Sequence, residues 1–198
     1  MKRHTHIGIS LGLTALVFLF FGKTLGHRFN SDDYLVIYHA SQISYDLLDV
    51  AREFLRSSWG LYYRPAITLF FDALESWFGP APMGYHFVSL LCYSALCVEV
   101  YLLGIALGKK PVAALAAALV FMTMTAHAEA IFWISSLNGA VENIFSLGSL
   151  IAFILWRRQM KKALYILSLL LFISALFLKE SAIALPGVLV LYDALLGG

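Results

Sequence analysis

Hydrophobic residues run along this chain in six long stretches, which cover residues 7–22, 84–108, 111–125, 139–156, 163–178 and 182–196. An α-helix rises about 1.5 Å per residue, so stretches of about 16 to 25 residues span, or nearly span, a hydrocarbon core of about 30 Å. The third and the last stretch are the shortest. The pattern predicts an all-α membrane protein with about six transmembrane helices.

Lysine and arginine residues cluster at alternate ends of successive stretches, and short loops rich in these residues stay in the cytoplasm. The clusters are Lys2 with Arg3, Lys109 with Lys110, and the basic residues of 157–162. One orientation satisfies all three clusters: the N-terminus lies inside, and the segments 23–83, 126–138 and 179–181 lie outside. No small-x-small cleavage site follows the first stretch, so we interpret it as an uncleaved anchor.

The long outer segment 23–83 contains two amphipathic patterns. Residues 45–56 alternate apolar and charged positions with helical spacing, and residues 64–74 do so again with Pro65 in the first turn. Helices with one apolar and one charged face lie along a membrane surface. We therefore predict surface-lying helices in a long first outer loop.

Composition agrees with a membrane protein. Hydrophobic residues make up 61% of the chain and charged residues 13%, whereas about 25% of a soluble domain is charged. The net charge of +2 is small and the cations stand at helix ends, which excludes electrostatic binding of nucleic acid. With no internal repeat and no separate soluble part, we interpret residues 1–198 as a single transmembrane domain.

Ionisable residues gather on the predicted outer side, and they come from separate segments: Asp32, Asp33, Arg64, His86, His127, Glu129, Lys179 and Glu180. The predicted inner loops carry no acid before Asp193. Ionisable groups at the rim of a membrane are costly unless they are paired or used. The asymmetry therefore predicts a functional site on the outer face.

Asp32 and Asp33 are adjacent carboxylates that follow the first stretch. Such a pair suits a general base or a cation site. Asn30, Ser31 and the two aspartates also precede the apolar run 34–38, as helix N-cap residues do. Both interpretations stand at this point, and they can coexist.

His127 and Glu129 place an imidazole and a carboxylate at the outer end of the third stretch. There they can serve as a proton relay, a phosphate contact or a metal ligand. The alternative is a polar loop that Phe132 and Trp133 anchor at the interface. Because the chain contains neither a PCxxC nor an HExxH motif, we predict no zinc site.

Lys179 and Glu180 interrupt an otherwise apolar run from 163 to 196, either as a tight turn or as a buried ion pair. Lys179 can also hold an anionic phosphate, and Arg64 can do so with bidentate geometry. Glu99 and Glu142 lie within predicted spans, where we favour interhelical hydrogen bonds over a transport path.

A series of motifs in this order resembles the GT-C class of polytopic, lipid-sugar-dependent glycosyltransferases, particularly the protein O-mannosyltransferases that carry tetratricopeptide repeats. The motifs are Asp32 with Asp33, the Tyr-Arg-Pro of 63–65, residues 84–91, residues 127–130 with 133–134, and residues 179–181 with 191–193. The chain matches the amino-terminal half of such an enzyme, with fewer spans and no repeat domain. Ser89 also stands where we would expect an Asn.

The resemblance implies transfer of a sugar, with inversion, from a polyprenyl-phosphate donor to an acceptor hydroxyl on the outer face of the membrane. A carboxylate takes the acceptor proton while basic groups stabilise the departing phosphate. The resemblance implies these roles: Asp32 or Asp33 as the catalytic base; Arg64, Lys179 and His127 at the donor phosphate; Glu129, Glu180 and His86 in support. We predict no cofactor and no metal ligand, while the need for a divalent cation, the sugar and the acceptor stay open.

Two other classes of function compete with an enzyme. One is a non-catalytic lipid-binding or assembly subunit, which keeps the outer groove without turnover. The other is a small transporter, which Glu99 and Glu142 suggest but which requires polar residues along a path through the membrane. We rank the enzyme first. The absence of glycosylation-rich domains and of an NxS/T sequon favours a bacterial inner membrane, with the N-terminus in the cytoplasm and the site facing the periplasm.

Overall fold

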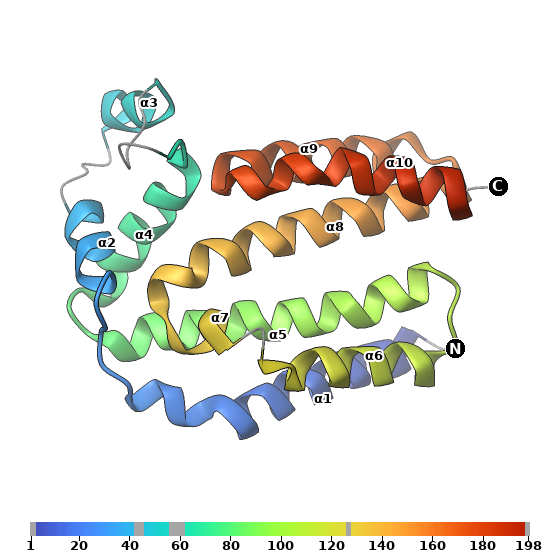
Figure 1. Cartoon of the computed structure of the whole chain (residues 1–198), viewed down its shortest axis with the longest axis horizontal. Coiled ribbons are helices and arrows are strands. Elements are labelled where there is room, and N and C mark those ends of the chain that lie inside the picture. Colours follow the sequence, from blue (N-terminus) through green and yellow to red (C-terminus); the bar gives the residue numbers. More distant parts are fainter. Residues whose placement is uncertain (1–2, 42–45, 56–61, 126–127, 197–198) are drawn as a thin grey trace.

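The computed structural model describes residues 3–41, 46–55, 62–125 and 128–196, and helices make up nearly all of their regular structure. Six helices form the body: α1 (Arg3–Phe21), α5 (Pro82–Ala106), α6 (Pro111–Thr123), α8 (Leu137–Gln159), α9 (Lys162–Leu178) and α10 (Leu185–Leu196). They run roughly parallel or antiparallel to one another (Figure 1). The prediction of an all-α protein is confirmed.

Helix α5 is the centre of the bundle and contacts α1, α6 and α8, while α8 also contacts α9. Every fourth residue of α5 from 85 to 101 is buried: Tyr85, Ser89, Tyr93, Cys97 and Tyr101. Near the end of α5, a Cβ added to Gly104 would lie 2.7 Å from the Cβ of Ala114. The absence of a side chain at Gly104 therefore allows α5 and α6 to approach closely.

Three helical segments are long and apolar enough to cross a membrane, namely residues 4–26, 82–106 and 134–159. Two further apolar helices are shorter, α6 with 13 residues and α9 with 17. The last hydrophobic stretch begins as the 3₁₀ turn η4 (Glu180–Ala184), which leaves 12 residues for α10. These lengths support membrane association, and the number of six spans stays a prediction.

The first outer loop contains η1 (Gly22–Gly26), α2 (Asp33–Ala40), α3 (Leu47–Leu55) and α4 (Pro65–Phe78). Both predicted amphipathic helices are present, as α3 and α4, and α4 begins at Pro65. Helix α4 also packs into the body, because Ile67, Phe71 and Leu74 are buried in the main core cluster. Helix α2 covers the apolar run that follows the N-cap candidates of residues 30–33, and it lies against α4.

The bundle has two chemically different ends. At one end, which we call the polar end, α2 and the start of α4 approach α7 (Ala128–Phe132), η3 (Ile134–Ser136) and η4. These elements together represent the three segments that were predicted to lie outside. The other end, which we call the basic end, holds the α5–α6 turn, the α8–α9 turn and both chain termini (Figure 1). This arrangement agrees with the alternation of lysine and arginine clusters along the sequence.

Candidate functional site

The adjacent acids Asp32 and Asp33 have different environments, and Asp33 is the buried one. Its Oδ1 accepts hydrogen bonds from the backbone N–H and the hydroxyl of Ser135, both at 2.8 Å. Its Oδ2 accepts a third bond from the backbone N–H of Asn30 at 2.9 Å. Asp33 therefore fastens the start of α2 to η3, which lies 102 residues later in the chain.

Asp32 is exposed and, among the described residues, has a single hydrogen bond, which the Ser31 hydroxyl donates to Oδ1 at 3.1 Å. It occupies the N-cap position of α2, but its side chain makes no capping hydrogen bond. The N-cap interpretation thus holds for the position of Asp32 and not for its carboxylate. That carboxylate lines a cavity instead.

This cavity, the outer cavity, has a volume of about 290 Å³ and lies at the polar end. It brings together Asp32, Arg64, Glu129 and Lys179, four of the predicted site residues, from four separate segments. Trp133 also lines it, and the indole N–H of Trp133 is buried without a hydrogen-bond partner among the described residues. The outer cavity is therefore rich in charged side chains.

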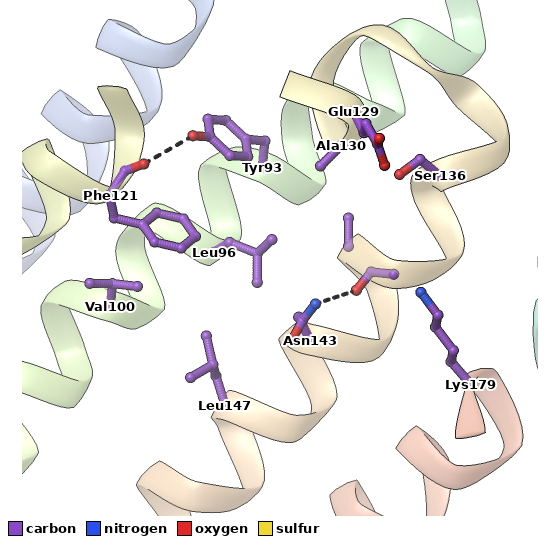
Figure 2. Close-up of a pocket in the computed structure, with 12 residues that line it drawn as sticks. Tyr93, Leu96, Val100, Phe121, Glu129, Ala130, Ser136, Asn143, Leu147 and Lys179 are labelled. Atoms are coloured by element: carbon purple, nitrogen blue, oxygen red, sulfur yellow. Dashed lines mark hydrogen bonds between the residues drawn. The ribbon is translucent and has the colours of Figure 1, made fainter. Parts of the chain in front are cut away.

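A second cavity, the inner cavity, has a volume of about 400 Å³ and adjoins the first (Figure 2). The two share Glu129, Ser136 and Lys179 in their linings. Away from these shared residues, the inner cavity is lined mainly by hydrophobic side chains of α5, α6 and α8, namely Tyr93, Leu96, Val100, Phe121 and Leu147. Together the two cavities offer a charged part and an apolar part.

Lys179 lies where the two cavities meet and its side chain points toward α8 (Figure 2). A Cβ added to Gly139, in the first turn of α8, would lie 3.3 Å from the Lys179 Nζ. Within the described parts of the chain, Lys179 has no hydrogen-bond or ion-pair partner. An ammonium beside the positive end of a helix dipole favours an anion between them.

Arg64, in contrast, is already engaged. Its Nε donates to Glu180 Oε2 at 2.8 Å and its Nη2 to Glu180 Oε1 at 2.5 Å, a bidentate pair, while the guanidinium carbon lies 4.4 Å from the centre of the Tyr62 ring. The hydrogen bond from Arg64 lowers the pKa of Glu180 from 4.5 to about 2. Residues 179 and 180 thus lie at the turn between α9 and η4. The ion-pair partner of Glu180 is Arg64, and the side chain of Glu180 is 56% exposed.

The remaining predicted site residues differ in position. Glu129 is exposed in α7 and lines both cavities. His86 is fully buried in α5, lines neither of these two cavities, and packs edge-on against the His27 ring at 5.9 Å between centroids. His127 lies outside the described residues. Among those described, no three His, Cys, Asp or Glu side chains are grouped so that they could hold a metal.

The two buried glutamates of the helices have different outcomes. Glu142 accepts hydrogen bonds from Ser146 at 2.5 Å and from Ser181 at 3.0 Å, which joins α8 to η4 and confirms the predicted tertiary bond. Glu99 faces Gly148 of α8, but its Oε2 is buried without a partner among the described residues. The predicted interhelical hydrogen bond is therefore not seen at the Oε2 of Glu99 within the described part of the chain.

Several residues of the site were not predicted, among them Ser135, Ser136 and Tyr93. The Tyr93 hydroxyl donates to the last carbonyls of α6, at 3.3 Å to Phe121 and 3.0 Å to Met122. Tyrosines at 85, 93 and 101 in an apolar run are a sequence signal for this role. Ser135 carries no such signal, because its partner is 102 residues away.

No known protein family, curated protein or solved structure matches this chain. Fold alone does not determine function. The chemistry of the two adjoining cavities is therefore the basis for a functional assignment.

Proposed function

We propose that this protein transfers a sugar, with inversion, from a polyprenyl-phosphate donor to an acceptor hydroxyl. The observation that carries the proposal is the junction, at Lys179, of a charged outer cavity with an inner cavity whose far side is lined by hydrophobic side chains. A polyprenyl-phosphate sugar has the same division, with a polar sugar, one anionic group and a hydrocarbon chain. The resemblance to GT-C enzymes supports the same ligand.

The donor fits with its phosphate beside Lys179 and the first turn of α8. The start of the prenyl chain then enters the inner cavity between Leu96, Val100 and Leu147. Each CH₂ group of the chain that is buried there adds about 0.8 kcal/mol of binding free energy.

Asp32 is the better candidate for the catalytic base. The Asp33 carboxylate accepts three hydrogen bonds, so protonating it would break contacts that hold the fold. Asp32 is exposed, lines the outer cavity and, within the described ranges, accepts a hydrogen bond only from Ser31. In the reaction the acceptor oxygen attacks the anomeric carbon, the phosphate leaves with the electrons of the broken C–O bond, and Asp32 receives the acceptor proton.

The proposal includes the location. The polar end faces the periplasm and the basic end the cytoplasm of a bacterial inner membrane, with the chain crossing it several times. The lysine and arginine turns at the basic end support this orientation.

The first experiment measures donor binding by native mass spectrometry of the purified protein in detergent, with polyprenyl-phosphate mannose as the probe. Lys179→Ala should weaken binding by about tenfold or more, because a hydrogen bond to a charged group is worth about 1.5–3 kcal/mol. Lys109→Ala, at the basic end, is the matched control and should bind as the wild type does. Equal binding by all three proteins contradicts the donor site.

The second experiment measures sugar transfer. Asp32→Asn should abolish turnover while donor binding and thermal stability remain. If Asp32→Asn turns over at the wild-type rate, the base assignment fails.

One observation favours a second candidate, a non-catalytic lipid-binding subunit. Glu180 already occupies Arg64, which leaves Lys179 as the only unpaired cation among the described residues that line the outer cavity. In this case the donor lipid binds through Lys179, and Asp32→Asn changes nothing because no transfer takes place.

A further inference from the structure

A third cavity lies on the other side of α2 at the polar end. This cavity, the lateral groove, has a volume of about 570 Å³ and shares no lining residue with the outer cavity. Helix α2 forms a wall of both, since Asp32 and Val36 line the outer cavity while Tyr34 and Tyr38 line the groove. A ligand in the groove therefore lies one helix away from the proposed donor.

The groove has an aromatic wall whose rings are held in place. Phe29 packs edge-on against Tyr34 at 5.7 Å and against Tyr85 at 5.4 Å between centroids. Tyr85 is fixed in turn, because its hydroxyl donates to the Gly79 carbonyl at 3.0 Å. Tyr34 and Tyr38 nevertheless remain 61% and 67% exposed, so their faces are open to a ligand.

The charges of the groove are balanced. Arg28 and Glu75 both line it, and neither forms an ion pair with any residue in the described ranges. One free cation and one free carboxylate carry no net charge and give no preference for an anion. They can instead exchange hydrogen bonds with the hydroxyls of a neutral ligand.

From this combination we propose that the lateral groove binds a neutral saccharide, which makes a saccharide the acceptor class. Sugar rings present apolar C–H faces to aromatic rings and hydroxyls to charged or polar groups, and a few well-placed polar groups on an apolar wall are typical of small-molecule sites. The acceptor role rests on the proposed glycosyl transfer. Saccharide binding in the groove does not depend on the proposed glycosyl transfer.

The test measures binding of short mannan, glucan and galactan fragments to the purified protein in detergent by saturation-transfer NMR. Wild type should transfer magnetisation to the C–H protons of at least one fragment. Tyr38→Ala and Glu75→Gln should weaken its binding by about five- to tenfold. Trp77→Ala is the matched control, because Trp77 is 74% exposed on α4 and does not line the groove.

Four results would overturn the inference. The first is that folded wild type binds no fragment, and the second is that Tyr38→Ala and Trp77→Ala bind equally. The third is that Tyr38→Ala binds the saccharide as the wild type does and only partitions less into lipid vesicles, which would make the tyrosines interfacial anchors. Displacement of the saccharide by a hydrophilic peptide of similar affinity would also reassign the groove.

Donor binding measured on the same variants separates this inference from the proposed function. Tyr38→Ala should keep the wild-type affinity for polyprenyl-phosphate mannose, and Lys179→Ala should keep the wild-type affinity for the saccharide. If the donor does not bind wild type but the saccharide does, the glycosyltransferase proposal fails, while the proposal that the lateral groove binds a saccharide is still supported.

Discussion

The polar end and the basic end of the bundle are held together in different ways. At the polar end, side chains bond across the chain: Asp33 to Ser135, Arg64 to Glu180 and Ser181 to Glu142. The basic end has one ion pair among the described residues, Arg157 with Asp193. The cavity there is lined by apolar side chains of α5, α8 and α10.

The difference shows where this fold can support chemistry. Polar bonds at one end fix backbone segments that are far apart in sequence, and they leave Asp32, Glu129 and Lys179 around a cavity. At the other end, close packing as at Gly104 and Ala114 holds α5 and α6 together. The polar contacts there, His6 with Tyr101 and Arg157 with Asp193, join helices and line neither of the two adjoining cavities. The largest effects of substitution on stability and on ligand binding should therefore come from different residues.

The largest expected effect is at Asp33. Asp33→Ala removes three hydrogen bonds and leaves buried donors unpaired, which should lower the free energy of unfolding by about 3 kcal/mol. Thermal unfolding in detergent measures this. The comparison is Asp193→Ala at the basic end, where a partly exposed ion pair should cost less than about 1 kcal/mol. Equal losses in both variants would remove the distinction between the two ends.

The next effect tests the packing of the basic end. Gly104→Ala places a Cβ 2.7 Å from that of Ala114, so α5 and α6 must separate, and the free energy of unfolding should fall by about 1–3 kcal/mol. Gly8→Ala in α1 is the control, because nothing lies within 4 Å of its added Cβ. Gly8→Ala should be neutral or stabilising. Wild-type stability of Gly104→Ala would show that the helices do not approach as described.

A smaller effect concerns ligand affinity at the polar end. Glu180→Gln releases the guanidinium of Arg64, which can then bind phosphate, so affinity for polyprenyl-phosphate mannose should rise by about three- to tenfold. Native mass spectrometry measures the change. Asp193→Asn breaks the other ion pair and should leave affinity unchanged. A fall in affinity for Glu180→Gln would mean that Glu180 positions Arg64 and does not compete for it.

The smallest effect is the pH dependence of the Arg64–Glu180 pair. The pKa of Glu180 is lowered to about 2 in the folded protein, so the pair stabilises the fold above the usual pKa of 4.5. This contribution is lost as the pH falls from 4.5 toward 2. The difference in melting temperature between wild type and Glu180→Gln should therefore shrink between about pH 6 and about pH 3. A difference that stays constant would mean that Glu180 is not ionised in the pair.

Local sequence patterns predicted the helices well, because hydrophobic runs and the position of Pro65 are properties of neighbouring residues. They also predicted that the acids and bases of the outer segments share one end. They did not show that Asp33 is engaged and Asp32 is free, because the deciding partner is Ser135. The partner of Glu180 was missed for the same reason, since Arg64 lies 116 residues earlier.

Helix α6 is short, and its end has a consequence for how a ligand arrives. It stops at Thr123, Tyr93 satisfies its last carbonyls, and Phe121 stands in the wall of the inner cavity. At about 1.5 Å per residue such a helix reaches only about two thirds of the way across a bilayer. In the proposed transferase, the lipid donor would enter sideways, by diffusion in the plane of the membrane. The donor concentration that the protein experiences is then the mole fraction of the donor among the membrane lipids. Turnover should therefore fall when inert lipid is added, even though the amount of donor per volume of solution stays the same.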